Sequence, residues 1–590
     1  MIYPYIRVPI PELGGYRTTR NKVVYLYVYY GERVVDENSE SSRHPRAKMI
    51  GRIEHDDSGN EVLMPNTSYY EVMNLPLPQI EVMEGAGRKP YKPKPEPLNQ
   101  RELYSEYSLG YGLTILLLSI ELKLSAALES AFGVKVAQQI LSLAAFMCEK
   151  QRSSFAELEL FLAQQYSVQA DLSLGRREAG QLLVELAKQP DKRGKFYSLW
   201  IASHQEQMNK IFYDVTSFST YSGQIIMAKR GYNRDHEQMI QVNEGLFCGK
   251  ETGLPLFMCS YDGSLVDCQN FNYALRRAKE HNLKSTKRNT VLVVDGGFRA
   301  NNFDWAHFLG YDLIVGVSCK YYSSVKKAFL NWADNLTEKD AHKVWSLDEQ
   351  HCYISSRVPL TMGNVDGYLI MYRDMSGYAF QLSALTRKRD SLARYLKSLK
   401  SVPEVKNFES WAKSFLPFFR VSKAKGRKGF TFEENQEEFQ AALSLCGNVT
   451  LFVSGEKLGS DRDILADYRS KESVEDCFDT TKNGLCDKRL HVHGDSQVTG
   501  KLFVMFIALI LRRSLHYRLR DPLKQYSLTD EDAIRELEQI CFTRHKDGWH
   551  LKDAISKLQK DLLTGLGLNY SMKIADDKDK STKKPLNNNQ

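Results

Sequence analysis

The chain has 590 residues, of which 42% are apolar and 26% are charged, so most of it is expected to fold as several globular domains. Its formal net charge of +8 is mildly basic, which is compatible with a nucleic-acid partner without requiring one. The ten cysteines form no C-x-x-C pair, and the His491-x-His493 pair has no further candidate ligand, so a zinc module is not expected.

The hydrophobic segments predict a cytoplasmic protein without a membrane partner. The first residues lack the basic and apolar regions of a signal peptide. The most apolar runs, 113–120 and 502–511, are much shorter than the ~20 residues that span a bilayer. We expect both runs to be buried core helices.

Residues 1–85 are predicted to form a small β-rich module. The run from Lys22 to Val35 is rich in tyrosine and valine, and residues 48–64 resemble a hairpin that turns at 57–60. Residues 86–101 contain four prolines among basic residues, which predicts a semi-extended linker.

From 102 to 206 the apolar residues recur with helical spacing. Within this region, residues 172–189 allow two interpretations. They could form the second helix of a helix-turn-helix, with Arg176 and Arg177 exposed, or an ordinary helix of a bundle.

Strand patterns return between 210 and 330 and indicate a mixed α/β domain. The segments 210–222 and 241–263 alternate in the manner of strands, and the sequence GKETG inside the second one predicts a hairpin. Residues 290–318 contain two buried strands that are separated by a Gly-Gly turn and a short helix.

Residues 331–440 are expected to be a β-rich insertion, which ends in a basic stretch containing Lys423, Lys425, Arg427 and Lys428. That stretch could follow a DNA backbone or be a solvated loop. A further strand is predicted at 448–455, followed by a helix from Tyr468 to Lys482. Residues 527–572 are predicted to be helical, with a capping box at Thr529 and Asp532, and 573–590 to be disordered.

Two aspartates stand out because they lie at predicted buried strands. Asp214 follows Ile211-Phe212-Tyr213, and Asp295 ends the run from Val291 to Val294. A buried carboxylate is costly unless it is paired or binds a metal, although each one alone could be a turn residue. If the two strands are neighbours, both carboxylates lie at one sheet edge, where a third acid from a later helix would complete a site for two divalent cations.

Four motifs in order resemble a known family, the bacterial insertion-sequence transposases of the DDE type. The chain is most similar to the group whose signature is Tyr-x2-Arg-x3-Glu-x6-Lys, over roughly residues 100–545. FYDVTSFSTYS resembles the family's Asp-x-Thr strand, GLPLFMCSYDG its Gly-Leu-Pro hairpin and VVDGGF its Asp-x-Gly-Phe turn. YRSKESVEDCFDTTK gives the signature residues at their spacing, with lysine in place of arginine: Tyr468, Lys471, Glu475 and Lys482.

The resemblance implies a multi-domain α/β protein with a ribonuclease H-like core. The core would comprise residues 207–330 and 441–526, interrupted by the insertion and preceded by a helical DNA-binding region at 102–206. It also implies that Asp214, Asp295 and Glu475 are catalytic and hold two Mg²⁺ ions, with Mn²⁺ as a substitute. Phosphate contacts are expected from these residues: Tyr468, Arg469, Lys471 and Lys482, with Lys423, Lys425, Arg427 and Lys428.

The activity implied by the resemblance is cleavage of DNA at the ends of an insertion sequence and joining of those ends to target DNA. End binding as a dimer is also implied. Two alternatives stay open: a stand-alone ribonuclease H-like nuclease, and an inactive relative that only binds DNA. Arg469 is a possible substitute for the arginine that Lys471 replaces, and no tryptophan lies between Trp411 and Trp549 to stack a base.

A helical wheel distinguishes the four acids of the segment 468–482. In one continuous helix the four signature residues share an arc of about 60°. Asp476 points away from that arc, whereas Glu472 and Asp479 lie within about 40° of Tyr468. We predict Glu475 as the catalytic acid because Lys471 and Lys482 flank it on the same face.

Overall fold

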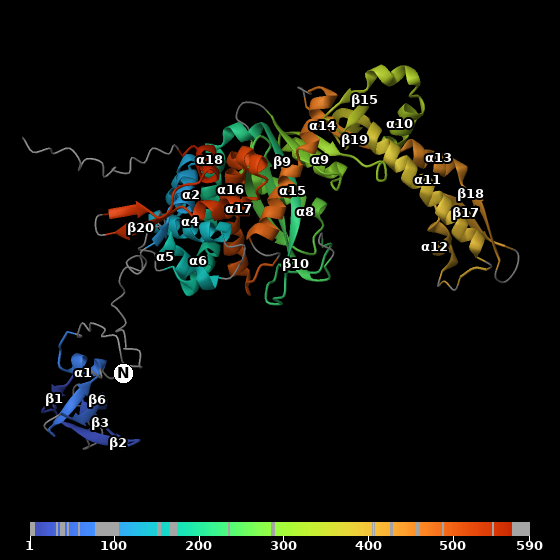
Figure 1. Cartoon of the computed structure of the whole chain (residues 1–590). Helices are drawn as coiled ribbons and strands as arrows, with labels where there is room; N and C mark the ends of the chain where they lie inside the picture. Colours follow the sequence, from blue (N-terminus) through green and yellow to red (C-terminus); the bar gives the residue numbers. More distant parts are fainter. Residues whose placement is uncertain are drawn as a thin grey trace, which may run out of the picture. The chain divides into compact units, whose positions relative to one another are not determined.

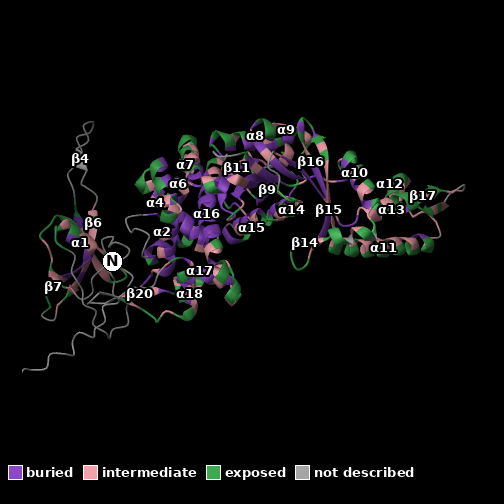
Figure 2. Ribbon diagram, turned by 90° about the horizontal axis from the view of Figure 1, so that it is seen from above, coloured by how far each residue is buried: buried purple, intermediate pink, exposed green. Residues whose placement is uncertain are grey.

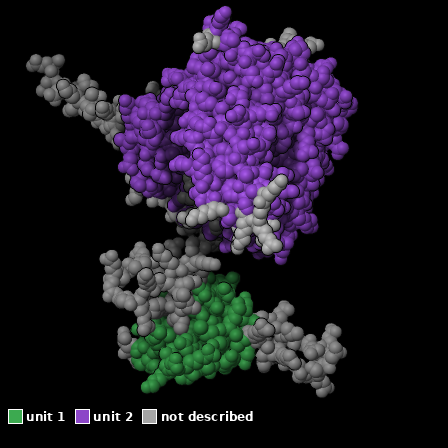
Figure 3. Space-filling view, turned by 90° about the vertical axis from the view of Figure 1, so that its right-hand side faces the viewer, with its two compact units in different colours: residues 1–98 green, residues 99–590 purple. Residues whose placement is uncertain are grey.

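The computed structural model divides into two units, Met1–Leu98 and Asn99–Gln590 (Figure 3). The residues that it describes are 6–30, 34–35, 42–43, 47–56, 59–76, 106–149, 155–165, 174–233, 237–284, 289–399, 401–403, 405, 407–424, 429–455, 459–485, 489–545 and 548–568. The predicted linker at 86–101 and the predicted tail at 573–590 lie outside these residues.

Unit 1 is built on a five-stranded antiparallel sheet with the strand order β1-β7-β6-β3-β2. Its long strands follow the predicted segments, because β3 contains the Tyr/Val run and β6 pairs with β7 around the predicted turn. Helix α1 and the inner strand faces enclose a separate core that includes Leu26, Ile50 and Leu63. The elements are β1 (Val8–Pro9), β2 (Gly15–Arg20), β3 (Val23–Tyr29), β4 (Val34–Val35), β5 (Ser42–Arg43), β6 (Ala47–His55), β7 (Glu61–Pro65) and α1 (Thr67–Val72).

The first part of unit 2, up to residue 209, is mainly helical, as the periodicity predicts. Its helices surround α16 (Asp495–Tyr526), which is mainly coloured as buried in Figure 2. The residues of α16 from Leu502 to Leu511 are all buried. The elements of this region are β8 (Glu106–Ser108), α2 (Gly110–Glu121), α3 (Leu124–Phe132), α4 (Val134–Glu149), η2 (Phe155–Glu157), α5 (Leu158–Gln164), α6 (Arg176–Ala187), α7 (Pro190–Ser203) and η3 (Gln205–Asn209).

Among the described residues, no single helix is long and apolar enough to cross a membrane. The bent pair α2 and α3 meets the length and composition criteria jointly, with an angle of 75° between the two helices. In α2, Leu116 and Ile120 are exposed, so this predicted core helix is buried on one side only.

A nine-stranded mixed sheet follows, with the order β11-β10-β9-β12-β13-β19-β16-β15-β14 (Figure 1). Strands β9, β12 and β13 are parallel neighbours, and the predicted hairpin forms β10 and β11. The elements are β9 (Lys210–Thr220), β10 (Ile240–Gly249), β11 (Pro255–Asp262), α8 (Asp267–Glu280), β12 (Thr290–Val294), α9 (Ala300–Phe308), β13 (Tyr311–Gly316), α10 (Ser323–Asp334), η4 (Glu338–Lys343), β14 (Trp345–Ser346), β15 (Cys352–Met362), β16 (Val365–Asp374) and β19 (Asn448–Ser454).

The segment 331–440 differs from the expected β-rich insertion. Its first strands extend the main sheet, because β16 pairs with β19. The rest is mainly helical and encloses a small aromatic core around Phe415, Phe418 and Phe439. A two-stranded hairpin, β17 with β18, completes this part. The elements are α11 (Met375–Ser398), α12 (Phe408–Lys413), β17 (Phe419–Lys423), β18 (Phe430–Glu434) and α13 (Gln436–Ser444).

The predicted helix at 468–482 is divided into three parts: α14 (Asp461–Arg469), α15 (Glu472–Asp479) and a π-helical turn η5 (Thr480–Leu485). The expectation of one continuous α-helix is therefore wrong. After α16 come α17 (Asp530–Glu538), β20 (Cys541–His545), β21 (Gly548–Leu551) and α18 (Lys557–Gly565). Thr529 and Asp532 form the predicted capping box, whereas β20 is a strand inside the segment that was expected to be helical, because it pairs with β8.

Candidate active site

The two aspartates lie on neighbouring parallel strands of the main sheet. Strand β9 pairs with β12, with Tyr213 opposite Val294, so Asp214 and Asp295 are the next residues along the two strands. Asp214 is mostly buried, and its Oδ1 accepts a hydrogen bond from the Val215 N–H at 2.8 Å. Asp295 is about half-exposed. The parallel pairing thus brings both carboxylates to the same level of the sheet, Asp214 within β9 and Asp295 directly after β12.

Helices α14 and α15 bring three further side chains to this position. The Lys471 Nζ lies 3.7 Å from Asp214 Oδ2, 3.7 Å from Asp295 Oδ2 and 3.5 Å from Glu475 Oε1. The Tyr468 hydroxyl donates a hydrogen bond to Asp295 Oδ1 at 3.0 Å. We refer to these five residues as the carboxylate cluster: Tyr468, Lys471, Glu475, Asp214 and Asp295.

The electrostatics of the carboxylate cluster favour the ionised forms of Asp295 and Lys471. Burial alone would raise the pKa of Asp295, but the Lys471 ammonium, the Gly296 N–H and the Tyr468 hydroxyl outweigh it and lower that pKa. Burial would lower the pKa of Lys471, but the three carboxylates outweigh it and raise that pKa. Burial and the Asp295 charge raise the pKa of Tyr468, so its hydroxyl keeps its proton. The cluster therefore places three carboxyl groups around one ammonium.

Gly316 makes room for Tyr468. A Cβ atom on Gly316, at the end of β13, would lie 2.4 Å from the Tyr468 hydroxyl oxygen and 3.2 Å from the Gly296 backbone nitrogen. No side chain fits there without moving the tyrosine. A glycine within an apolar strand is the sequence signal for such a close approach, but Gly316 lies outside the motifs that predicted the site.

Helix α15 is held on the sheet by its apolar residues. Val474 and Cys477 are fully buried, and the Cys477 Sγ lies 3.8 Å from the Cys248 Sγ on β10. This attachment fixes the direction of Glu475, whose side chain is exposed apart from its contact with Lys471.

The other acids of α15 lie elsewhere. Asp476 pairs with Arg513 of α16 at 3.6 Å, and Asp479 accepts a hydrogen bond from Asn483 at 2.5 Å. Glu472 is exposed. Of the four acids in the segment, Glu475 is the one whose carboxylate contacts Lys471 beside both aspartates.

Several predicted phosphate contacts do not belong to the carboxylate cluster. The Arg469 guanidinium lies 5.2 Å from the Tyr353 ring and 3.7 Å from Asp374, so it does not replace Lys471 at the carboxylates. Lys482 lies on the π-helical turn, where its charge adds to the hydrogen bonds from Ser219 and Arg489 that lower the pKa of Glu237. In the basic stretch, Lys423 lies on β17 with its Nζ over the Phe408 ring at 5.2 Å. The other three, Lys425, Arg427 and Lys428, lie outside the described residues.

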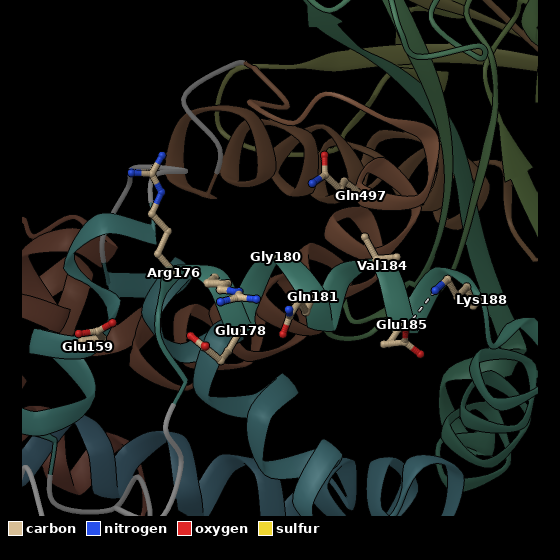
Figure 4. Close-up of a pocket in the computed structure, with 10 residues that line it drawn as sticks. Glu159, Arg176, Glu178, Gly180, Gln181, Val184, Glu185, Lys188 and Gln497 are labelled. Atoms are coloured by element: carbon tan, nitrogen blue, oxygen red, sulfur yellow. Dashed lines mark hydrogen bonds and ion pairs between the residues drawn. The ribbon is translucent and has the colours of Figure 1, made fainter. Parts of the chain in front are cut away.

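Helix α6, the alternative helix-turn-helix element, lines an open groove of about 930 Å³ (Figure 4). Its apolar side packs on α16, where a Cβ on Gly500 would lie 2.0 Å from the Leu183 carbonyl oxygen. Its exposed side carries Arg176 and Arg177, but the groove contains as many acids as bases. This packing favours the bundle-helix interpretation. The charged residues of the groove are Arg176, Arg177, Lys188, Glu159, Glu178 and Glu185.

The donor chemistry of the carboxylate cluster fits a hard divalent cation, since carboxylate oxygens are the ligands that Mg²⁺ prefers. As arranged here, the cluster is centred on Lys471. Within the described residues, no group of three or more His, Cys, Asp or Glu side chains lies close enough together to hold a metal ion. Metal binding at these carboxylates therefore requires Lys471 to withdraw from between them.

Comparison with solved structures gives a weak likeness to a transposase. No protein-family model matches the chain, and no curated protein sequence matches it. The chain is similar to a piggyBac transposase in the cryo-EM structure of its synaptic complex with hairpin DNA, with a TM-score of 0.32 and 10% identity. The similarity covers 74% of each chain. A TM-score this low does not by itself establish a shared fold.

Proposed function

We propose that the chain is a DNA transposase of the DDE type, which cleaves DNA at the ends of an insertion sequence and joins those ends to target DNA. The observation that carries the proposal is the meeting of Asp214, Asp295 and Glu475 around Lys471. These residues are 261 positions apart at the extremes, yet they come together from two parallel strands and a helix.

The sheet supports a ribonuclease H-like core. Strands β9, β10 and β11 are consecutive antiparallel neighbours, and β12 and β13 then run parallel to β9 on its other side. Asp214 and Asp295 are the next residues after the last paired residues of β9 and β12. The third acid, Glu475, comes from α15, which packs on β9 and β10. Other regions of unit 2 are proposed to bind the element ends.

In this proposal Asp214, Asp295 and Glu475 would hold Mg²⁺. When bound, the metal ions supply an activated water or 3′-hydroxyl and stabilise the leaving oxygen. Tyr468 holds Asp295 in a fixed orientation through its hydroxyl. Lys471 balances the carboxylate charge and, once it withdraws, is placed to contact a phosphate of the scissile strand as a single point charge.

The test is a comparison of matched carboxylate variants on DNA that carries the sequences flanking the gene. With Mg²⁺ or Mn²⁺ the protein should nick the element ends, and with Ca²⁺ it should bind them without cutting. Glu475→Gln and Asp295→Asn should abolish cutting and strand transfer while end binding stays within a few-fold, because neither removes a phosphate contact.

The controls are the other acids of α15. Glu472→Gln and Asp476→Asn should keep most activity, and Asp479→Asn should be intermediate at worst. Robust cutting by Asp295→Asn in EDTA would exclude the metal-dependent mechanism. An inactive Asp479→Asn beside an active Glu475→Gln would show that the wrong acid has been chosen.

The two alternatives predict different products. A stand-alone nuclease would release nicked DNA without joining it to a target. An inactive relative would bind the ends and cut nothing, although the intact set of three carboxylates argues against it.

A further inference from the structure

An exposed tyrosine follows the strand that carries Asp214. Tyr221 is the residue after β9, and 80% of its surface is accessible. The Arg489 guanidinium lies over its ring, 5.6 Å from the ring centre. Among the described residues no large hydrophobic side chain is more exposed, and a ring with a cation placed against it offers a stacking surface to another planar group.

Arg489 is held in place by a partly buried polar network. Its Nη2 donates to Glu237 Oε1 at 2.8 Å, and the Ser219 hydroxyl donates to Glu237 Oε2 at 2.7 Å. The buried Asn233 amide donates in turn to the Ser219 oxygen at 3.0 Å. The hydrogen bonds from Ser219 and Arg489 lower the pKa of Glu237, which keeps it ionised. The position of the cation at the tyrosine ring is thus fixed before any ligand arrives.

The surroundings of Tyr221 are basic and contain further exposed apolar surface. Lys229 and Arg230 are exposed on the segment that returns towards β10. Tyr232 and Ile226, on the same segment, are each 73% exposed. Two acids beside them, within the described residues, are engaged within the protein, since Glu237 binds Arg489 and Asp495 accepts the Ile226 N–H at 2.9 Å.

The position of this surface relates it to the carboxylate cluster. Tyr221 is seven residues after Asp214, directly beyond the end of the same strand, which corresponds to about 23 Å at ~3.3 Å per residue. One strand of DNA covers that distance with about seven nucleotides at ~3.4 Å each. A strand held at the cluster and running along β9 would therefore reach Tyr221.

We propose that Tyr221, with Arg489 behind it, stacks an unpaired base of the DNA strand that continues from the carboxylate cluster. That this strand is the DNA held at the cluster rests on the proposed function. The chemistry of the surface itself would accept any nucleic acid that has an exposed base. Stacking on an aromatic ring accepts every base, so the contact adds affinity without sequence preference.

The test measures binding of fluorescein-labelled oligothymidine in EDTA by fluorescence anisotropy, with the full chain. Tyr221→Ala should weaken binding by about 5- to 100-fold, the range that one stacked base supplies. Tyr221→Trp should bind at least as well as the wild type. Phe308→Ala is the matched control, because Phe308 is 74% exposed on α9 and is not part of this surface, so it should leave binding unchanged.

A second readout reports stacking itself. An oligothymidine with one 2-aminopurine should lose fluorescence when it binds the wild type and keep it when it binds Tyr221→Ala. Equal affinity of Tyr221→Ala and wild type, or no binding of oligothymidine by the wild type, would overturn the inference. A protein that shows these effects but cuts no DNA end would instead contradict the proposed function, so the two failures are distinguishable.

Discussion

Lys471 balances the charge of the candidate active site at the level of single residues. Its ammonium contacts three carboxylates that would otherwise repel one another, and its own side chain is 10% exposed. An arginine at this position would donate two parallel hydrogen bonds to one carboxylate, whereas the compact lysine ammonium can contact all three carboxylates. The lysine is therefore suited to a site in which carboxylates come from different elements.

The close contact between Gly316 and Tyr468 leads to the first prediction. Gly316→Ala should displace the Tyr468 hydroxyl from Asp295 and reduce cutting of element ends by at least tenfold, with a loss of stability of about 1–3 kcal/mol from overpacking. Thermal unfolding and a cleavage assay measure the two effects. Gly297→Ala is the matched control, because a Cβ there meets nothing within 4 Å. Full activity of Gly316→Ala would show that the tyrosine contact is dispensable.

Glu244, on β10, leads to a prediction about pH. It is 1% exposed, and burial raises its pKa from 4.5 to about 8, against a smaller opposing effect of Ser260. Below pH 4.5 the carboxyl is neutral in both the folded and the unfolded chain. As the pH rises towards 8, the unfolded chain ionises first, so the folded state progressively loses relative stability.

Glu244→Gln removes this titration. The variant should therefore gain stability relative to wild type as the pH rises: the difference in their free energies of unfolding should increase by about 2–4 kcal/mol between pH 5 and pH 8. Denaturant unfolding at the two pH values measures the change. The exposed Glu129→Gln on α3 is the control and should show no such difference. A constant offset between Glu244→Gln and wild type across this range would contradict the prediction.

At the scale of elements, the break between α14 and α15 shows what the sequence could not predict. Residues 468–482 contain neither proline nor an internal glycine, so local propensity favours a continuous helix. The break arises from tertiary contacts, because α15 buries Val474 and Cys477 on the sheet while Lys471 turns towards Asp214. The spacing of three and four residues still brings Tyr468, Lys471 and Glu475 to one side.

Some of the strand pairings could be predicted from the sequence, and others could not. The β10–β11 hairpin follows from a local turn sequence, whereas the adjacency of β9 and β12 was only a condition of the predicted site, since two apolar runs about 80 residues apart do not specify their pairing. The pairing of β16 with β19 joins segments separated by about 75 residues, and no turn sequence predicts it. The expected separate insertion therefore appears in part as an extension of the main sheet.

The contact between α6 and α16 gives a prediction at this scale. Gly500→Ala should separate the two helices and cost at least 2 kcal/mol, because the added Cβ would lie 2.0 Å from the Leu183 carbonyl oxygen. Gly180→Ala is on the same helix pair but meets nothing within 4 Å, so it should stabilise by about 0.5–1 kcal/mol. Urea unfolding of the two variants measures both values, and equal effects would contradict the packing argument.

At the scale of the whole molecule, the two units have separate cores. The core of unit 1 around Leu26, Ile50 and Leu63 shares no residue with the core of unit 2. Deleting residues 1–98 should therefore change the unfolding midpoint of the remaining chain by less than about 2 °C. Calorimetry of the two proteins measures this change. A lower midpoint, or loss of a cooperative transition, would show that unit 2 depends on unit 1.

The position of Glu475 late in the chain has a consequence during synthesis. Asp214 leaves the ribosome about 260 residues before Glu475, which is a delay of about 13–50 s at ~5–20 residues per second. The buried helix α16 follows α15 in the sequence and is therefore translated later still. If the chain is a transposase, a nascent polypeptide thus lacks the third carboxylate until residue 475 has been translated, and products of a ribosome that stops earlier cannot form the proposed site.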